Sequence, residues 1–331
     1  MKFYLVLNLE KINIIQNLLL AKVDWFGGKG MNSIKTKLIS FLGLLIGGIC
    51  IGLSIVSFVN STNALKLNIG KTLPKIAEQT GNSIQARIEG ELNSLETIAA
   101  RDDITDPNNS WENKKGVLLD EVKRINCIRM GIADKNGDMK NSDGTSANVK
   151  DREYFQKAIS GKSTVIEPMV SKTADKNITM GYAVPIKNND EIVGVLLEAI
   201  DGYTLSGITD QVKFGQTGLA FIINKTGTII SNPNRDLVTQ MYNGIDEAKN
   251  DTQLQGLAVL EKKMIAGETG LGEYKYQGAD KFVGYAPVSG TTWSVGIAIS
   301  KNEILSELNS LQISVMVSSV VFILIGFCII Y

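Results

Sequence analysis

Two stretches without a charged residue, 38–59 and 308–331, constrain this chain more than any other feature of its sequence. They run for 22 and 24 residues, and most of their residues are apolar. The core of a bilayer is about 30 Å thick and requires about 20 residues of helix, so each stretch can cross it. The alternatives are a buried core helix for both and an uncleaved signal peptide for the first. We predict two transmembrane helices.

The flanking charges predict the orientation of these spans. Lys29, Lys35 and Lys37 come just before the first span, which places residues 1–37 in the cytoplasm by the positive-inside rule. Residues 60–309 are then outside, and the second span returns inward. We therefore expect a cell-membrane protein with two spans and a large extracytoplasmic region between them. Because the chain stops at Tyr331, we also expect that an output domain is missing.

The first thirty residues raise a question about the start of translation. Gly27-Gly28-Lys29-Gly30 precedes Met31, and a translated ribosome-binding site would have this composition because Gly and Lys codons are purine-rich. Our hypothesis is that Met31 is the true start. The alternative is a short amphipathic cytoplasmic helix.

Composition excludes several classes of function. The chain contains no histidine, so it has no Ser-His-Asp triad, no HExxH zinc site and no imidazole pH switch. Its three cysteines are too few and too scattered for a zinc site or a disulfide framework. Lys and Arg number 34, as do Asp and Glu, and this zero net charge argues against nucleic-acid binding. We found no catalytic constellation, and we predict neither enzymatic activity nor a metal or cofactor.

The region after the first span, residues 60–104, is predicted to be a stalk helix. Its apolar residues follow one another at spacings of 4, 4, 3 and 3, which is a helical stripe. The stripe consists of Ile84, Ile88, Leu92, Leu95 and Ile98.

A pattern rich in strands begins after Thr105 and occurs twice. Three segments of the first copy are matched, in the same order, by segments about 90 to 106 residues later. The pairs are Ile132–Gly137 with Ile222–Gly227, Ile159–Ser163 with Ile265–Thr269, and Gly181–Pro185 with Gly284–Pro287. Three matches in order indicate two copies of one module, residues 105–205 and 206–305, which we call the first and the second module.

Each module shows strand, turn, helix and then antiparallel strands, which is the layout of a PAS-like fold. An antiparallel sheet of this kind buries one face and leaves the other to loops and a helix, where a small ligand can be held. The predicted fold class is α+β: a long N-terminal helix and two PAS-like antiparallel-sheet modules, flanked by two transmembrane helices.

Several short motifs are spread over both modules. They are Asp151-Arg152-Glu153-Tyr154-Phe155, Gly161-Lys162, Met180–Pro185, Gly194–Asp201 and Gly215-Gln216-Thr217-Gly218. With these motifs, the organisation resembles the double Cache (dCache) sensor region of bacterial methyl-accepting chemotaxis proteins over roughly residues 31–331. Sensor kinases and cyclic-di-GMP enzymes carry similar outer regions.

The resemblance implies that the first module is membrane-distal and binds the ligand. Family members that bind amino acids hold the ligand carboxylate with an Arg-x-aromatic-aromatic segment and the amine with an Asp at the end of a later strand. Arg152, Tyr154, Phe155 and Asp201 fall on those positions. A guanidinium offers a planar pair of donors to a carboxylate, and an aspartate balances an ammonium. The sequence departs from the pattern at Ala147, where amino-acid binders have Tyr, and at Tyr154, where they have Trp.

Each of these residues also has a structural interpretation. Arg152 and Asp201 can instead form an ion pair between helix and sheet, and the aromatic rings of Tyr154 and Phe155 can belong to the core. Tyr182 can line the pocket through its hydroxyl, although its counterpart Tyr285 favours a framework role.

Two functions are consistent with these features. The first is a chemoreceptor sensor that binds a small extracellular ligand, an amino acid or related carboxylate or amine. We expect it to be a homodimer that signals through the missing domain to a chemotaxis kinase and coupling protein. The second is the sensor half of a membrane histidine kinase or diguanylate cyclase.

Overall fold

The computed structural model describes residues 34–171 and 178–330, and our hypothesis about Met31 as the start lies outside this range. The chain divides into two compact units. One consists of residues 1–64 and 306–331, and the other of residues 65–305. We describe each unit by itself.

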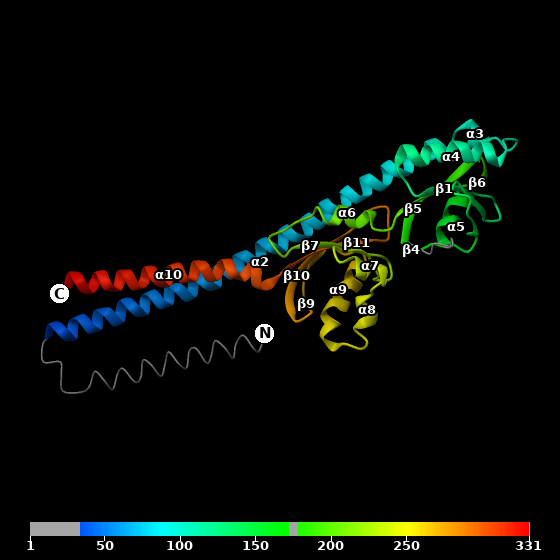
Figure 1. Ribbon diagram of the computed structural model, residues 1–331. Coiled ribbons are helices and arrows are strands. Elements are labelled where there is room, and N and C mark those ends of the chain that lie inside the picture. Colours follow the sequence, from blue (N-terminus) through cyan, green and yellow to red (C-terminus); the bar gives the residue numbers. More distant parts are fainter. Residues whose placement is uncertain (1–33, 172–177, 331) are drawn as a thin grey trace. The chain divides into compact units, whose positions relative to one another are not determined.

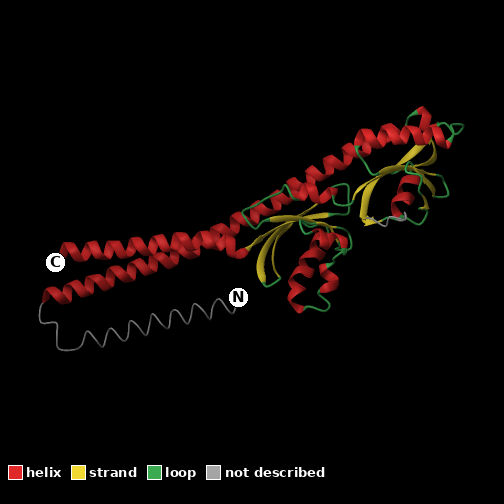
Figure 2. Ribbon diagram, in the orientation of Figure 1, coloured by secondary structure: helices red, strands yellow, loops and turns green. Residues whose placement is uncertain are grey.

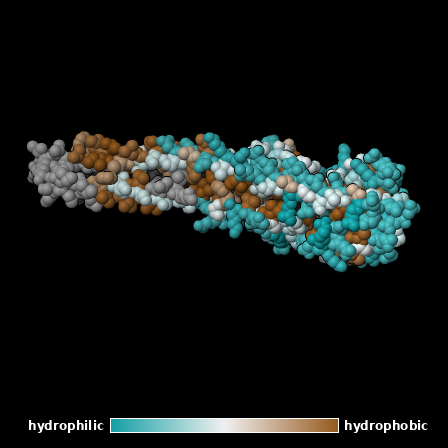
Figure 3. All heavy atoms as spheres, turned by 90° about the horizontal axis from the view of Figure 1, so that it is seen from above, coloured by the Kyte–Doolittle hydropathy of each residue, from teal (hydrophilic) through white to brown (hydrophobic). Residues whose placement is uncertain are grey.

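The first unit contains the helical segments predicted to span a membrane. Helix α2 (Ile34–Ala99) has an apolar part that begins at Phe41, and its most apolar window reaches a mean hydropathy of 2.4 with no residue buried. Among the described residues this is the one helix long and apolar enough to cross a bilayer. In helix α10 (Lys301–Ile330), the described side chains include a further apolar stretch, Ile313–Phe322. Hydrophobic side chains dominate the visible surface of these segments in Figure 3, whereas the surface of the sheet modules is mostly hydrophilic.

The second unit is built from two antiparallel sheets and the helices on their faces (Figures 1 and 2). The helices of the first module and its junction are α3 (Asp102–Thr105), α4 (Trp111–Ile125), α5 (Glu153–Ile159) and α6 (Thr204–Thr209). Those of the second module are α7 (Arg235–Thr239), α8 (Gly244–Glu247), the short 3₁₀ turn η1 (Thr252–Leu254) and α9 (Gln255–Ile265).

The sheet of the first module has six strands in the order β3-β2-β1-β6-β5-β4, with every neighbouring pair antiparallel. The strands are β1 (Arg129–Ala133), β2 (Asp138–Asn141), β3 (Ser146–Asn148), β4 (Thr164–Val170), β5 (Ile178–Asn188) and β6 (Glu191–Asp201). Helix α5 packs on one face through Phe155 and Ala158, and α2 packs on the opposite face.

The sheet of the second module repeats this order without the outermost strand, as β8-β7-β11-β10-β9. Its strands are β7 (Leu219–Ile223), β8 (Ile229–Ser231), β9 (Gly270–Tyr276), β10 (Ala279–Pro287) and β11 (Ser294–Ser300). Strand β11 continues directly into α10. The carboxylate of Glu303 in the first turn of α10 accepts the backbone N–H groups of Gln216 (2.6 Å) and Thr217 (2.8 Å), which ties this turn to the loop before β7.

One hydrophobic core runs beneath α2 and includes residues of both sheets. The predicted stripe faces it: Ile84, Ile88, Leu95 and Ile98 are buried, and Leu92 packs partly against them. A 3.6-residue period places such residues on one side of a helix, so burial of this stripe fixes α2 along the sheets. The predicted long helix and PAS-like antiparallel sheets are confirmed.

The sequence repeat corresponds to equivalent positions in the two sheets for the first two pairs. Gly137 and Gly227 adopt positive φ (83° and 85°) in the β1–β2 and β7–β8 turns, and Gly161 and Gly267 do so just after α5 and α9. The third pair differs. Tyr182 belongs to the core beneath α2, whereas Tyr285 belongs to the core on the other face, beside α9. Because side chains alternate along a strand, a one-residue offset moves the tyrosine across the sheet.

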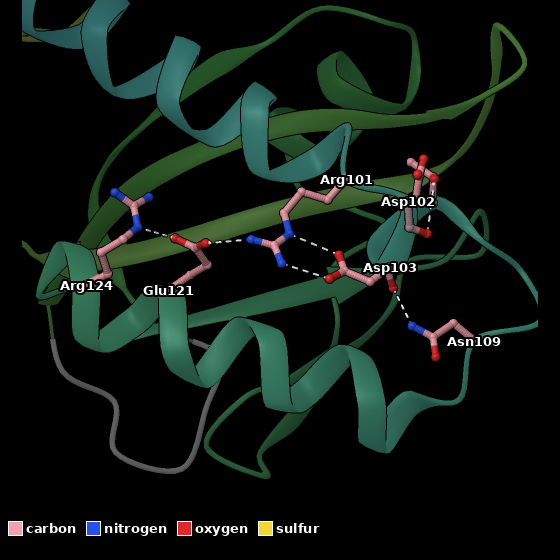
Figure 4. A network of polar contacts seen from close by, with 7 residues as sticks. Arg101, Asp102, Asp103, Asn109, Glu121 and Arg124 are labelled. Atoms are coloured by element: carbon pink, nitrogen blue, oxygen red, sulfur yellow. Dashed lines mark hydrogen bonds and ion pairs between the residues drawn. The ribbon is translucent and has the colours of Figure 1, made fainter.

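A network of charged side chains connects the end of α2 with the first helices of the first module (Figure 4). The guanidinium of Arg101 donates to both carboxylate oxygens of Asp103 (3.0 and 2.8 Å) and to Glu121 on α4 (3.1 Å). Arg124 donates to the other oxygen of Glu121 (2.6 Å), and Asn109 donates to the Asp103 carbonyl (2.6 Å). Arg101 therefore joins the segment after α2 to both α3 and α4.

Replacing Arg101 should loosen this junction. Arg101→Ala removes the one guanidinium that pairs with both Asp103 and the buried Glu121, and we expect the free energy of unfolding to fall by about 1 kcal/mol after allowance for exposure of the arginine. Urea unfolding of the full chain measures this. The matched control is Lys249→Ala, which breaks the exposed Lys249–Asp246 pair (2.7 Å) and should cost at most about 0.5 kcal/mol. Equal losses in both variants would show that the network adds nothing beyond a surface pair.

The second module contains a buried carboxyl group without a full set of partners. Glu261 on α9 is 1% exposed, and its Oε2 atom has no hydrogen-bond partner. Burial raises the pKa of Glu261 to about 8, and the same cause raises the pKa of the neighbouring Tyr276. Glu261 is therefore protonated in the folded protein at neutral pH but ionised in the unfolded chain.

This difference predicts a pH dependence of stability. Since the folded-state pKa lies above the ordinary value of 4.5, stability should fall as pH rises from 4.5 to 8, by about 1.4 kcal/mol for each pH unit, and then level off. Glu198, whose pKa is raised to about 7 by burial and by Glu91, adds a similar fall that ends one unit lower. In Glu261→Gln the slope between pH 7 and 8 should vanish in thermal unfolding curves. A slope that persists there would contradict the assignment.

Candidate ligand-binding site

The first module contains a cavity of about 60 Å³ between its sheet and helix α5. A water molecule occupies about 10–15 Å³ by this measure, so the cavity holds several atoms of a small ligand. Its walls combine apolar side chains with a few polar ones. They are Arg129, Gly131, Met139, Asn141, Val149, Arg152, Tyr154, Ile166, Met169, Val170, Ser171, Thr179, Met180, Leu197, Glu198 and Ala199.

Strand alternation explains which residues of the sheet face the cavity and form what we call its floor. Arg129 and Gly131 of β1 point to the same side of the sheet, and Gly131 is paired directly with Asn141 of β2. Leu197 and Ala199 of β6 lie beside them, since Ala199 is paired with Arg129. A Cβ on Gly131 would lie 2.2 Å from the Asn141 side-chain oxygen, so glycine is needed to bring that amide over the floor.

Arg152 occupies the position just before α5. Its backbone N–H donates to the Val149 carbonyl (3.0 Å), which fixes the turn into the helix. One guanidinium nitrogen, Nη1, contacts the Met169 sulfur at 3.8 Å, a weak acceptor. The buried Nε has no hydrogen-bond partner. A buried donor without a partner costs about 1–3 kcal/mol, and a carboxylate placed in the cavity would supply the missing acceptor.

Arg129 is a second guanidinium in the wall, and the sequence analysis did not identify it. It is only 6% exposed, donates to the Ser171 hydroxyl (2.7 Å) and lies 3.6 Å from the Asp143 carboxylate. Its charge is thus balanced within the protein, whereas that of Arg152 is not balanced by any ion pair among the described residues.

Of the five predicted ligand-binding residues, the cavity wall includes two, Arg152 and Tyr154. Burial raises the pKa of the Tyr154 phenol, so the ring stays neutral. Phe155 points into the core between α5 and the sheet and is 1% exposed. Its core interpretation therefore agrees with the structure.

The other two predicted residues lie elsewhere. Tyr182 is 2% exposed in the core beneath α2, on the opposite face of the sheet from the cavity. Asp201 is exposed at the end of β6, and its carboxylate accepts the Tyr203 backbone N–H (2.7 Å), which stabilises the following turn. Asp201 is not paired with Arg152 in the described part of the chain, so the ion-pair interpretation of Arg152 is wrong.

Several wall residues could not be found by the sequence motif. Asn141, Thr179 and Met169 come from three different strands, and only the order of the sheet brings them together. A partial signal existed at Arg129, because a charged residue that opens an apolar strand is unusual in a buried sheet. Within residues 34–171 and 178–330, no cluster of three potential metal ligands accompanies the cavity.

Comparison with known proteins decides the family. The sequence model of the Cache domain matches residues 61–308, which is most of the chain. The chain belongs to the Cache domain family. The chain is similar to the methyl-accepting chemotaxis protein McpA of Pseudomonas putida, with 22% identity over 267 residues. That match covers 78% of this chain but 39% of McpA, so the chain spans about two fifths of the length of this relative.

Solved domains of other proteins share the fold. The ligand-binding domain of the Pseudomonas fluorescens chemoreceptor CtaA, in complex with L-leucine, superposes with a TM-score of 0.58 at 20% identity, covering 73% of this chain and 99% of that domain. The extracellular domain of the putative histidine kinase mmHK1S-Z2 gives a TM-score of 0.54 at 17% identity, covering 70% of this chain and 97% of that domain. The fold thus occurs in the CtaA chemoreceptor domain and in the mmHK1S-Z2 domain.

Proposed function

We propose that the chain is the sensor region of a transmembrane chemoreceptor and that the cavity of its first module binds a small carboxylate, an amino acid or a related acid. The observation that carries the proposal is the buried Nε of Arg152, a donor without an acceptor at the wall of a small, mostly apolar cavity. Arginine presents two parallel donors to a carboxylate, and a site with little water strengthens such bonds.

The relatives support this assignment. McpA is a methyl-accepting chemotaxis protein, and the domain of CtaA binds L-leucine. In our proposal residues 38–59 and 308–331 are two membrane spans, residues 60–104 the stalk, and the two modules, 105–205 and 206–305, the extracytoplasmic sensor. Two copies form a homodimer, and a domain beyond residue 331 acts on a chemotaxis kinase and its coupling protein.

A thermal-shift screen tests the ligand class. The full chain in detergent is heated with amino acids, organic acids, amines and purines, one compound at a time. A carboxylate present at 100 times its Kd should add about 2.7 kcal/mol of stability, whereas amines and purines without a carboxylate should add none. Stabilisation by carboxylate-free compounds alone would refute the proposed ligand class.

The alternative is the sensor half of a histidine kinase or a diguanylate cyclase, and the similarity to mmHK1S-Z2 favours its consideration. Joining residues 1–331 to the cytoplasmic part of an unrelated chemotaxis receptor separates the two. We expect the strongest compound from the screen to change chemotaxis-kinase activity in this chimera. A chimera that binds the compound but never changes kinase activity would favour the alternative.

A further inference from the structure

Three polar contacts between the first module and the second start next to the cavity wall. Glu167 of β4 follows the wall residue Ile166, and Glu153 of α5 stands between the wall residues Arg152 and Tyr154. The carboxylates of both glutamates reach residues of the second module. The strand and the helix that carry part of the wall are therefore attached to the neighbouring sheet.

Glu167 makes the more specific attachment. Its Oε1 accepts the indole N–H of Trp293 (2.8 Å), and its Oε2 accepts the side-chain amide of Asn224 (2.9 Å). Both bonds are partly buried, and hydrogen bonds to an ionised acceptor are stronger than neutral ones. The pairing of β4 with β5 shifts register between Ile166 and Met169, so Glu167 sits at an irregularity of the edge strand. Such irregularities change the direction in which side chains point. Here the Glu167 carboxylate points toward the second module and accepts hydrogen bonds from both Trp293 and Asn224.

Glu153 makes a weaker second attachment. Its Oε2 lies 2.7 Å from the ammonium of Lys225, and its other oxygen lies 3.0 Å from Lys157 one turn later. All three side chains are about half exposed, so the pair adds little stability. Its effect is to hold the first turn of α5 close to the β7–β8 turn.

The partners of Glu167 lie on the route to α10. Trp293 is buried and directly precedes β11, which runs without a break into α10 at Lys301. Asn224 is itself held in place, because its side-chain oxygen accepts the backbone N–H groups of Thr226 and Thr228 (both 3.0 Å). A displacement of β4 would thus act on two positioned groups of the second module.

We propose that Glu167 is a positioning residue that couples the cavity of the first module to the start of β11, through its bonds to Trp293 and Asn224. A change in the cavity that moves β4 also moves the Glu167 carboxylate and therefore the Trp293 indole bonded to it. Because β11 follows Trp293 and continues into α10, this displacement reaches α10. Coupling of this kind needs a contiguous element that responds to the site, and β4 forms part of the wall as well as part of the contact. The inference rests on the first-module cavity being the sensory site but not on the chemistry of its ligand.

The test fills the cavity by mutation and therefore needs no ligand. Ala199→Leu projects additional methyl groups from the floor into the cavity. The full chain is prepared in lipid nanodiscs with Trp25→Phe and Trp111→Phe, which leaves Trp293 as the single tryptophan. Acrylamide quenching of its fluorescence reports its surroundings. We expect Ala199→Leu to change the quenching constant about twofold when Glu167 is present and to have almost no effect in Glu167→Met.

Two further variants keep the result decisive. Glu191→Gln breaks the surface pair with Lys135 (2.5 Å) in the same module, and the response to Ala199→Leu should survive in it. If Ala199→Leu fails to fold, Ala199→Val fills less of the cavity and takes its place. An equal response with and without Glu167 would overturn the proposal. So would the absence of any response in a variant whose unfolding curve shows an intact chain. Failure of the ligand screen would leave this result untouched.

Discussion

Arg152→Met is expected to abolish most of the affinity for the strongest carboxylate found in the screen. The side chain keeps its approximate length but loses the buried donors, and truncating one partner of a buried charged hydrogen bond costs about 2–5 kcal/mol. A loss of about 3 kcal/mol corresponds to a roughly 100-fold weaker Kd. Isothermal titration of the full chain with that compound measures the change.

Two controls distinguish binding from folding. Arg124→Met removes an exposed arginine of α4, and its effect on the Kd should be negligible. Arg152→Lys keeps the charge but not the planar pair of donors, so we expect an intermediate, about tenfold, loss. The ligand-free Arg152→Met protein should be at least as stable as the wild type, because its arginine carries an unsatisfied buried donor. Unchanged affinity in Arg152→Met would mean that the ligand binds elsewhere.

Gly284→Ala is expected to destabilise the second module strongly. A Cβ at Gly284 would lie 2.3 Å from the Leu73 carbonyl carbon and 2.5 Å from the Pro74 nitrogen, both in the backbone of α2. Backbone atoms cannot turn aside as a side chain can, so α2 must move away from β10. Overpacking costs about 1–3 kcal/mol where side chains can adjust, and we expect about 3 kcal/mol or more here.

Thermal unfolding of the full chain checks this prediction. The matched control is Gly90→Ala in the same helix, where a Cβ would meet nothing within 4 Å. Alanine favours an exposed helix interior over glycine by about 1 kcal/mol, so Gly90→Ala should raise the unfolding temperature. An unfolding temperature that Gly284→Ala leaves unchanged or raises would show that α2 does not pack against Gly284 in solution.

Local patterns predicted the helix and the repeat because each depends on residues close in sequence. The stripe from Ile84 to Ile98 needs only a period of 3.6 residues, and the turn at Gly137 needs only its own backbone geometry. The match of Tyr182 with Tyr285 failed for a different reason. Strand parity depends on pairing with distant strands, and a one-residue offset puts the two rings on opposite faces.

The same distinction between local patterns and the pairing of distant strands explains which residues of the site could be predicted. Arg152 and Tyr154 share one short motif, and both line the cavity. Tyr182 and Asp201 were placed by their position along strands, but the alternation of β5 and the turn after β6 direct them elsewhere. Arg129, Asn141 and Thr179 meet only when β1, β2 and β5 are assembled in one sheet. No pattern within a single segment contains that information.

The central claim is that the first-module cavity binds a carboxylate through Arg152, and the most direct measurement is a crystal structure with the strongest compound from the screen. We predict that one carboxylate oxygen lies within hydrogen-bonding distance of Arg152 Nε, between α5 and the floor formed by Gly131 and Ala199. Density for the compound in the second module, or in the cavity with its carboxylate turned away from Arg152, would contradict the account.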